Sequence, residues 1–175
     1  MSGIWGRLCA AALVALASAT AAIAGPAELE TFLKLHRCEV ERQLAFLFDV
    51  SHPQGRYLIL SWRAPDESYV QCEFEDDNSS ALCEAASGFY LKPPQRIASS
   101  DGLFALARRG FALDGSQGNY SQILPLAGEA SLPDIADLML ASLYEGYRGF
   151  VERGIKLKAS DSPSDPNFQR CEPVL

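Results

Sequence analysis

The sequence predicts an α+β fold, in which one antiparallel sheet of about five strands has helices packed mainly on one of its faces. A helical repeat of apolar residues over Ala27–Asp49 comes first, and three runs with strand periodicity follow it, joined by short turns. Further helix and strand patterns come after the Pro-Pro pair at 93–94. The resulting order is α-β-β-β-α-β-β-α, which is typical of a single sheet covered by helices.

The first predicted helix runs from Ala27 to about Asp49. Pro26 suits its first turn, because proline lacks the amide hydrogen that this position leaves unpaired. His36 falls on or near the apolar side of this helix, and we interpret it as a histidine at the edge of the core. Apolar residues recur on that side at helical spacing: Leu29, Phe32, Leu33, His36, Val40, Leu44, Leu47 and Phe48.

Three strands are predicted next, at 56–63, 68–75 and 81–90, and the turns between them are rich in Pro, Asp, Asn and Ser. Along the first two strands an apolar set alternates with a second set that contains tyrosine and glutamine. The sequence does not decide which set faces the helices, and we assign the apolar set to them. The apolar set is Leu58, Leu60, Trp62, Val70 and Phe74, and the second set is Tyr57, Ile59, Tyr69 and Gln71.

Two helices and two short strands complete the predicted domain. The second helix starts from a cap at Ser99, Ser100 or Asp101, runs to Arg109 and stops at a glycine. The strands are expected at 111–113 and 120–126, and the third helix is expected after the cap Ser131. We place the folded domain at 25–155 and a polar, Pro-rich C-terminal tail at 156–175.

The first 24 residues have the layout of a secretory signal peptide. One basic residue precedes an apolar, alanine-rich run from Leu8 to Ala19, and the small-x-small site Ala22-Ile23-Ala24 follows. We expect cleavage near Ala24 and a periplasmic or secreted product; an uncleaved N-terminal anchor is the alternative. The apolar run is too short for a convincing membrane span, so no stable membrane insertion is expected.

Four cysteines remain after such cleavage, and in an oxidising compartment we expect them to form two disulfides. If the hairpin turn is at 77–78, facing residues have numbers that add up to 155, so Cys72 faces Cys83 at a separation that a disulfide can bridge. A longer turn would shift this register. Four cysteines allow three pairings; with Cys72–Cys83 formed, exclusion gives Cys38–Cys171, which ties the first helix to the tail.

Charge and motifs narrow the classes of function. The formal net charge is −7, and no Lys/Arg cluster with interleaved aromatics is present, so no nucleic-acid partner is expected. The cysteines are too far apart for a zinc site, and His36 and His52 are the only histidines, so we expect neither a metal nor a cofactor. An acidic hairpin tip lacks the calcium-loop pattern, and we interpret it as a solvated turn: Glu73, Glu75, Asp76 and Asp77.

A series of short motifs resembles the TY-Chap and YbjN-like group, whose fold is like that of type III secretion chaperones. The resemblance covers roughly 27–150 and implies a domain that binds polypeptide, often as a dimer, without catalysis. The chain departs from the group in having a signal peptide, four further cysteines and a Pro-rich tail. The motifs, in order, are Tyr69-Val70-Gln71, Glu84-Ala85-Ala86-Ser87, Pro93-Pro94-Gln95-Arg96, Arg109-Gly110-Phe111, Gly118-Asn119-Tyr120 and Ile135-Ala136-Asp137-Leu138.

The residues favour a non-catalytic binding module, and the resemblance implies that it is chaperone-like. Tyr57, Ile59, Tyr69 and Gln71 would give an outer sheet face with aromatic and amide groups, which suits contact with a polypeptide or with a second copy of the chain. A half-exposed strand face without a partner is an equally compatible interpretation.

Two other classes of function stay open. One is a small periplasmic hydrolase that uses carboxylates on the sheet, such as Glu73 and Glu84. The other is a structural or regulatory envelope protein whose tail makes the contact.

Overall fold

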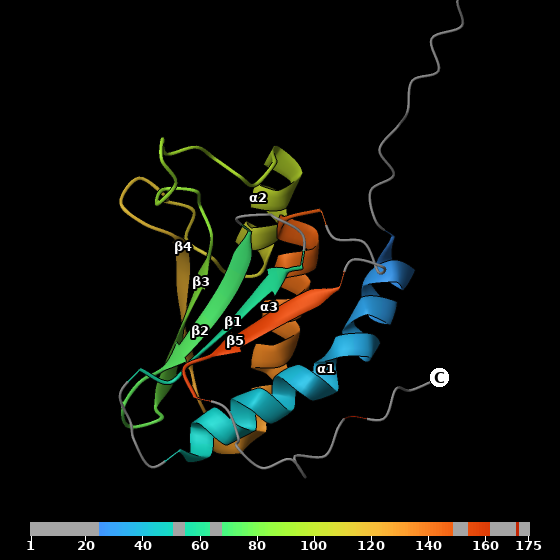
Figure 1. The fold of residues 1–175 in the computed structure, drawn as a ribbon, viewed down its shortest axis with the longest axis vertical. Coiled ribbons are helices and arrows are strands. Elements are labelled where there is room, and N and C mark those ends of the chain that lie inside the picture. Colours follow the sequence, from blue (N-terminus) through green and yellow to red (C-terminus); the bar gives the residue numbers. More distant parts are fainter. Residues whose placement is uncertain (1–24, 51–54, 64–67, 149–153, 162–170, 172–175) are drawn as a thin grey trace, which may run out of the picture.

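The computed structural model describes residues 25–50, 55–63, 68–148, 154–161 and 171, and it confirms the α+β class (Figure 1). The signal-peptide segment, His52 and most of the C-terminal tail lie outside the described residues. The elements are α1 (Pro26–Asp49), β1 (Tyr57–Trp62), β2 (Tyr69–Phe74), β3 (Ser80–Ala85), α2 (Ser100–Arg108), β4 (Tyr120–Pro125), the 3-10 helix η1 (Gly128–Ser131), α3 (Leu132–Gly146) and β5 (Ile155–Ala159).

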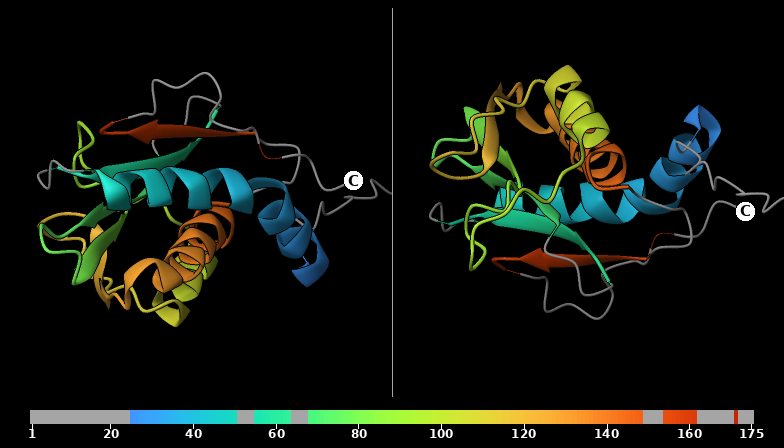
Figure 2. Two further views of the ribbon diagram at one scale, coloured as in Figure 1. Left: turned by 90° about the horizontal axis from the view of Figure 1, so that it is seen from below. Right: turned by 90° about the horizontal axis from the view of Figure 1, so that it is seen from above.

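The five strands form one sheet in the order β4-β3-β2-β1-β5, and all neighbouring strands are antiparallel. The central β1–β2–β3 part is the predicted meander. Figure 2 shows the sheet curving around the helices, which all lie on one of its sides. Helix α3 packs against β1 and β2, while α1 and α2 pack on α3 from either side. In the described part of the chain, no helix covers the second face of the sheet.

The alternation along the strands decides which residues enter the core. Leu58, Leu60 and Trp62 of β1 are buried with their counterparts on β2 and β3, whereas the residues between them are not. The assignment of the apolar set to the helix side is therefore confirmed. Aromatic rings join the layers here, because Phe32 of α1 lies 5.6 Å from Trp62 and 4.9 Å from Tyr144 of α3, measured between ring centroids.

The helix ends follow the sequence signals closely. The Ser99 hydroxyl accepts a hydrogen bond from the Gly102 amide and so caps α2. Gly110, at φ +95°, stops the helix in the left-handed region that glycine adopts easily. Ser131 stands at the predicted start of α3, but its hydroxyl accepts from the Ala127 amide and makes no capping bond.

Two predicted strands differ in the structure. The third strand ends at Ala85, because the chain turns at Gly88 with φ +89°. Residues 111–113 contribute only an isolated bridge, in which Ala112 pairs with Ser121 of β4. The fifth strand is instead Ile155–Ala159, which pairs with β1. Residues 156–159, which the sequence analysis places in the tail, belong to the sheet.

Both predicted disulfides are present. Cys72 and Cys83 are opposite each other in the β2–β3 register, with Cα atoms 4.1 Å apart. The flanking pair Glu75–Ser80 is hydrogen-bonded, so the alternation of the ladder makes Cys72–Cys83 a non-hydrogen-bonded pair, the kind in which side chains approach most closely. The turn is longer than two residues but is centred on 77–78, which preserves the register. Cys38 of α1 bonds to Cys171.

Arg56 is the one buried cationic side chain among the described residues, at 3% exposure. Its guanidinium donates to the carbonyls of Phe48 at the end of α1 and of Glu75 at the end of β2. A cation there also offsets the negative end of the α1 dipole, since the last turn of α1 has no basic residue. Arg56 therefore joins the first helix to the hairpin. No helix of the described part is long and apolar enough to cross a membrane.

Candidate functional site

The four residues predicted for binding lie together on the sheet face that no helix covers. Ile59 of β1 is directly opposite Gln71 of β2. Tyr57 and Tyr69 belong to the same face, one on each side of that pair along the strands. All four are partly exposed. The structure thus assembles an aromatic, aliphatic and amide patch across the two central strands, which we call the open-face patch (Tyr57, Ile59, Tyr69, Gln71).

The polar groups of this patch are held by neighbouring residues. Gln71 donates a side-chain hydrogen bond to Glu84, which faces it on β3. The Tyr69 hydroxyl accepts a hydrogen bond of 2.8 Å from the Asn119 amide. Burial raises the pKa of Tyr69 above its usual 10.0, against the opposing effect of the Asn119 hydrogen bond. Tyr69 is therefore neutral at physiological pH, and its ring is fixed in place on the sheet.

A pair of exposed aromatic residues extends the patch at one end. Phe89 and Tyr90 follow the turn at Gly88, and their rings meet edge to face at 5.2 Å between centroids. The Tyr90 side chain is 66% exposed and lies near enough to Tyr69 to contribute to its raised pKa. The buried Ser87 hydroxyl accepts from the Phe89 amide and donates to the Gly118 carbonyl, which fixes this loop to the one before β4.

Sequence reasoning missed the role of Phe89 and Tyr90, since it placed both in the third strand. The signal was Gly88, because a glycine inside a strand pattern often marks a bend. A second omission is the pair Lys156 and Lys158 of β5, which face Ser61 and Ile59 across the strand pair and so belong to the open face. Their alternation with apolar residues was the signal for that strand.

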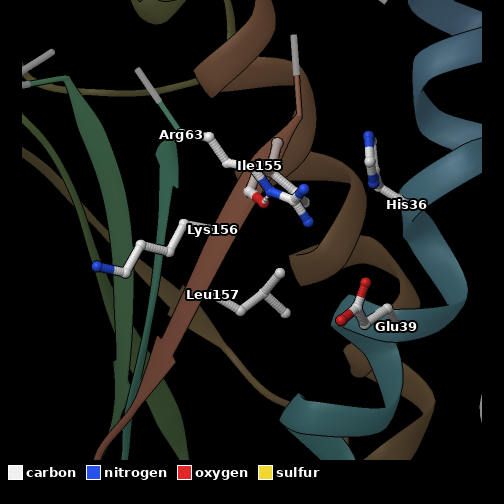
Figure 3. Close-up of a pocket in the computed structure, with 6 residues that line it drawn as sticks. All are labelled: His36, Glu39, Arg63, Ile155, Lys156 and Leu157. Atoms are coloured by element: carbon white, nitrogen blue, oxygen red, sulfur yellow. Dashed lines mark hydrogen bonds between the residues drawn. The ribbon is translucent and has the colours of Figure 1, made fainter. Parts of the chain in front are cut away.

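A pocket of about 490 Å³ lies between α1 and β5 (Figure 3). Arg63 crosses it from the end of β1, and its Nε donates to the Ile155 carbonyl at 2.9 Å. His36 lines the helix side and packs its ring on Phe32, so it is the core-edge histidine that the sequence indicates. The lining residues are His36, Glu39, Arg63, Ile155, Lys156 and Leu157.

The electrostatic state of His36 follows from this environment. Burial, and then the positive charge of Arg63, lowers the pKa of His36 below the usual 6.5. The imidazole is therefore neutral at pH 7. Its Nε2 atom is buried and has no hydrogen-bond partner among the described residues.

The carboxylates proposed for a hydrolase lie on the open face. Glu84 accepts the hydrogen bond from Gln71, and Glu73 is exposed opposite Leu82 on the neighbouring strand. At the hairpin tip, hydrogen bonding from the Ser79 side chain, and then from the Ser79 amide, lowers the pKa of the Asp77 carboxyl. Within the described ranges no group of three or more His, Cys, Asp or Glu side chains is placed to hold a metal ion.

Comparison of the chain with protein-family models, with curated proteins and with solved structures finds no match. The resemblance to the TY-Chap and YbjN-like group stays a prediction that rests on the sequence motifs.

Proposed function

We propose that the mature chain is an exported polypeptide-binding module, which works by contact through the open-face patch and carries out no chemical reaction. One observation carries the proposal: Tyr57, Ile59, Tyr69 and Gln71 come from two strands yet form one partly exposed patch on the uncovered side of the sheet. Tyrosine supplies a large contact area at low conformational cost, and it is enriched where proteins bind one another.

The mechanism follows from how the patch is built. Tyr69 and Gln71 are fixed by Asn119 and Glu84, so little side-chain freedom is lost when a partner binds. The exposed rings of Phe89 and Tyr90 add apolar area at the end of the patch. A partner would be held by reversible burial of these rings, with the polar strand residues around them fixing its orientation.

Export is part of the proposal and has independent support. The two disulfides fit an oxidising compartment, and the chain-closing Cys38–Cys171 bond would be reduced in a cytosol. A periplasmic or secreted location after removal of the first 24 residues is consistent with both bonds.

Site-specific photo-crosslinking tests this function. A photoreactive phenylalanine analogue is placed at Tyr57 of the open-face patch, and a matched control carries it at Leu35, an apolar residue of α1 that is 56% exposed on the helix side of the molecule. We expect crosslinks to one or a few polypeptides from position 57 in the native envelope, and none of these from position 35. Equal labelling from the two positions, or none from position 57, contradicts the proposal.

A quantitative variant completes the test. Replacing Tyr57 and Ile59 together by serine removes the centre of the patch while leaving the buried face of β1 intact. Loss of two central interface side chains should weaken binding of the crosslinked partner tenfold or more, as expected for residues that dominate an interface. The control variant Leu35→Ser should change the affinity for that partner less than twofold. Sedimentation of the purified chain at rising concentration shows whether that partner is a second copy.

A further inference from the structure

The outer edge of β5 has backbone groups that the sheet does not use. Hydrogen bonds from the Arg63 amide to the Gly154 carbonyl and from the Ser160 amide to the Tyr57 carbonyl bracket the β1–β5 pairing. Because bonded pairs alternate in an antiparallel ladder, Leu157 belongs to a non-bonded pair and directs its N–H and C=O away from β1. In the described part of the chain no strand pairs with this edge.

The opposite edge of the sheet is partly protected. On β4, Ser121 exchanges both backbone hydrogen bonds with Ala112, and Pro125 has no amide hydrogen to offer. Proline and short covering segments are among the usual means by which proteins block an edge strand. Between them, the outward-directed backbone of Ile123 has no partner in the described part of the chain, so β4 offers one free residue. The two edges therefore differ in how much unpaired backbone they offer to an added strand, and β5 offers more.

The pocket between α1 and β5 runs beside this free edge. Leu157 forms part of its floor, on the side of β5 that faces α1, while His36 and Glu39 project from the helix (Figure 3). A chain placed next to β5 at the usual spacing of about 4.8 Å would occupy this pocket. Its backbone would bond to Leu157.

Charge indicates the composition of the occupant. Although the whole protein has a net charge of −7, three cations stand against the single carboxylate of Glu39 at this edge and its pocket, which makes the edge locally basic: Arg63, Lys156 and Lys158. Lys156 and Lys158 point to the open face, whereas Leu157 points to the core side. A complementary strand would therefore alternate acidic residues with apolar ones. Two copies paired through β5 would place these lysines against one another, which is unfavourable.

We propose that an extended polypeptide segment with alternating acidic and apolar residues binds as a sixth strand along β5, in the pocket beside α1. This inference rests on the proposed polypeptide-binding function and adds the location and the chemical class of the bound segment. Strand addition of this kind obtains affinity from main-chain hydrogen bonds and selectivity from the alternate side chains. The bound strand would extend the open face beyond Lys156 and Lys158.

The test uses the full mature protein and a fluorescent seven-residue peptide in which glutamate and valine alternate, with both ends blocked. The expected result is saturable binding, loss of binding when the amides that face β5 are N-methylated, and no binding of the lysine–valine peptide. Replacing Lys156 and Lys158 by glutamate should weaken binding of the acidic peptide roughly tenfold or more, since two attractive cross-strand pairs become repulsive. The control variant Lys92→Glu makes the same charge change in an exposed loop, and it should alter the affinity for the acidic peptide less than twofold.

Hydrogen exchange gives a readout that surface charge alone would not produce. The Leu157 amide should exchange rapidly in the free protein and become protected when the acidic peptide is bound. Absence of binding, insensitivity to N-methylation, or a Leu157 amide already protected through self-association overturns the inference. If the peptide test fails but crosslinks from position 57 are still found, the proposed function stands and only the strand-addition site is wrong. If the peptide test and the crosslinking both fail, the proposed function itself is wrong.

Discussion

Removing the Cys38–Cys171 disulfide should destabilise the protein more than removing Cys72–Cys83. The two bonds differ mainly in the length of chain that they close, with sequence separations of 133 and 11 residues. A disulfide acts largely by restricting the unfolded chain, and the restriction grows with loop length. The chain-entropy relation gives about 5 kcal/mol for the long loop and about 3 kcal/mol for the short one at 25 °C.

The variants should match the environment of each bond. Cys38 and Cys171 are at least partly exposed, so serine is a suitable replacement there. Cys72 and Cys83 are buried in the core, and alanine avoids placing hydroxyl groups among apolar side chains. Losing about 5 kcal/mol should lower the melting temperature of a chain of this size by roughly 15 °C.

Urea unfolding of the oxidised mature protein supplies the measurement. Trp62, which lies in the core against Phe32, is the only tryptophan left after removal of the first 24 residues, so its fluorescence reports on the domain. The Cys38/Cys171 variant should also show a larger m-value, because its unfolded state exposes more surface. A smaller stability loss for this variant than for the Cys72/Cys83 variant would refute the loop-length reasoning.

Two further predictions concern buried cations and pH. Arg56→Met should lower the free energy of unfolding by about 3 kcal/mol, because the carbonyls at the ends of α1 and β2 lose a charged donor. The control Arg108→Met, at an exposed arginine, should change the free energy of unfolding by less than about 0.5 kcal/mol. Equal losses for the two variants in urea unfolding would contradict the role given to Arg56. Because the pKa of His36 is lowered in the folded protein, the unfolded chain takes up a proton at this residue first as the pH falls below about 6.5. Acidification therefore lowers the free energy of unfolding. Between pH 7.5 and 5.5 the wild type should therefore lose more stability than His36→Gln, and parallel pH profiles would show that His36 is not the group responsible.

Local patterns in the sequence were sufficient for most of the elements. Helix α1 and the β1–β2–β3 meander were predicted because their signals lie within short windows: apolar residues at helical spacing, strict alternation, and turn residues between them. The Cys72–Cys83 pairing also followed from local arithmetic, since a symmetric turn at the hairpin fixes which residues face each other. Burial of the apolar strand set could be assigned for the same reason.

The errors occurred where a local signal had competing interpretations. Phe111–Leu113 resembles a strand, yet only Ala112 pairs with the sheet. Ile155–Ala159 alternates clearly, but it is five residues long and a polar, Pro-rich stretch follows it. The sequence analysis therefore ends the domain at Ile155 and counts 156–159 as tail. Its partner β1 lies almost a hundred residues earlier, and no short window contains both strands.

The sequence by itself was sufficient for the α+β class, the cysteine pairing and the residues of the open-face patch, and it predicts export. Only the tertiary structure decided that β5 is an edge strand, that its free edge adjoins His36 on α1, and that Lys156 and Lys158 lie beside Ile59. Periodicity specifies which side of an element is apolar, because this depends on neighbours three or four positions away at most. Which elements meet depends on how all the apolar faces are buried at once, and this is a property of the whole packed chain.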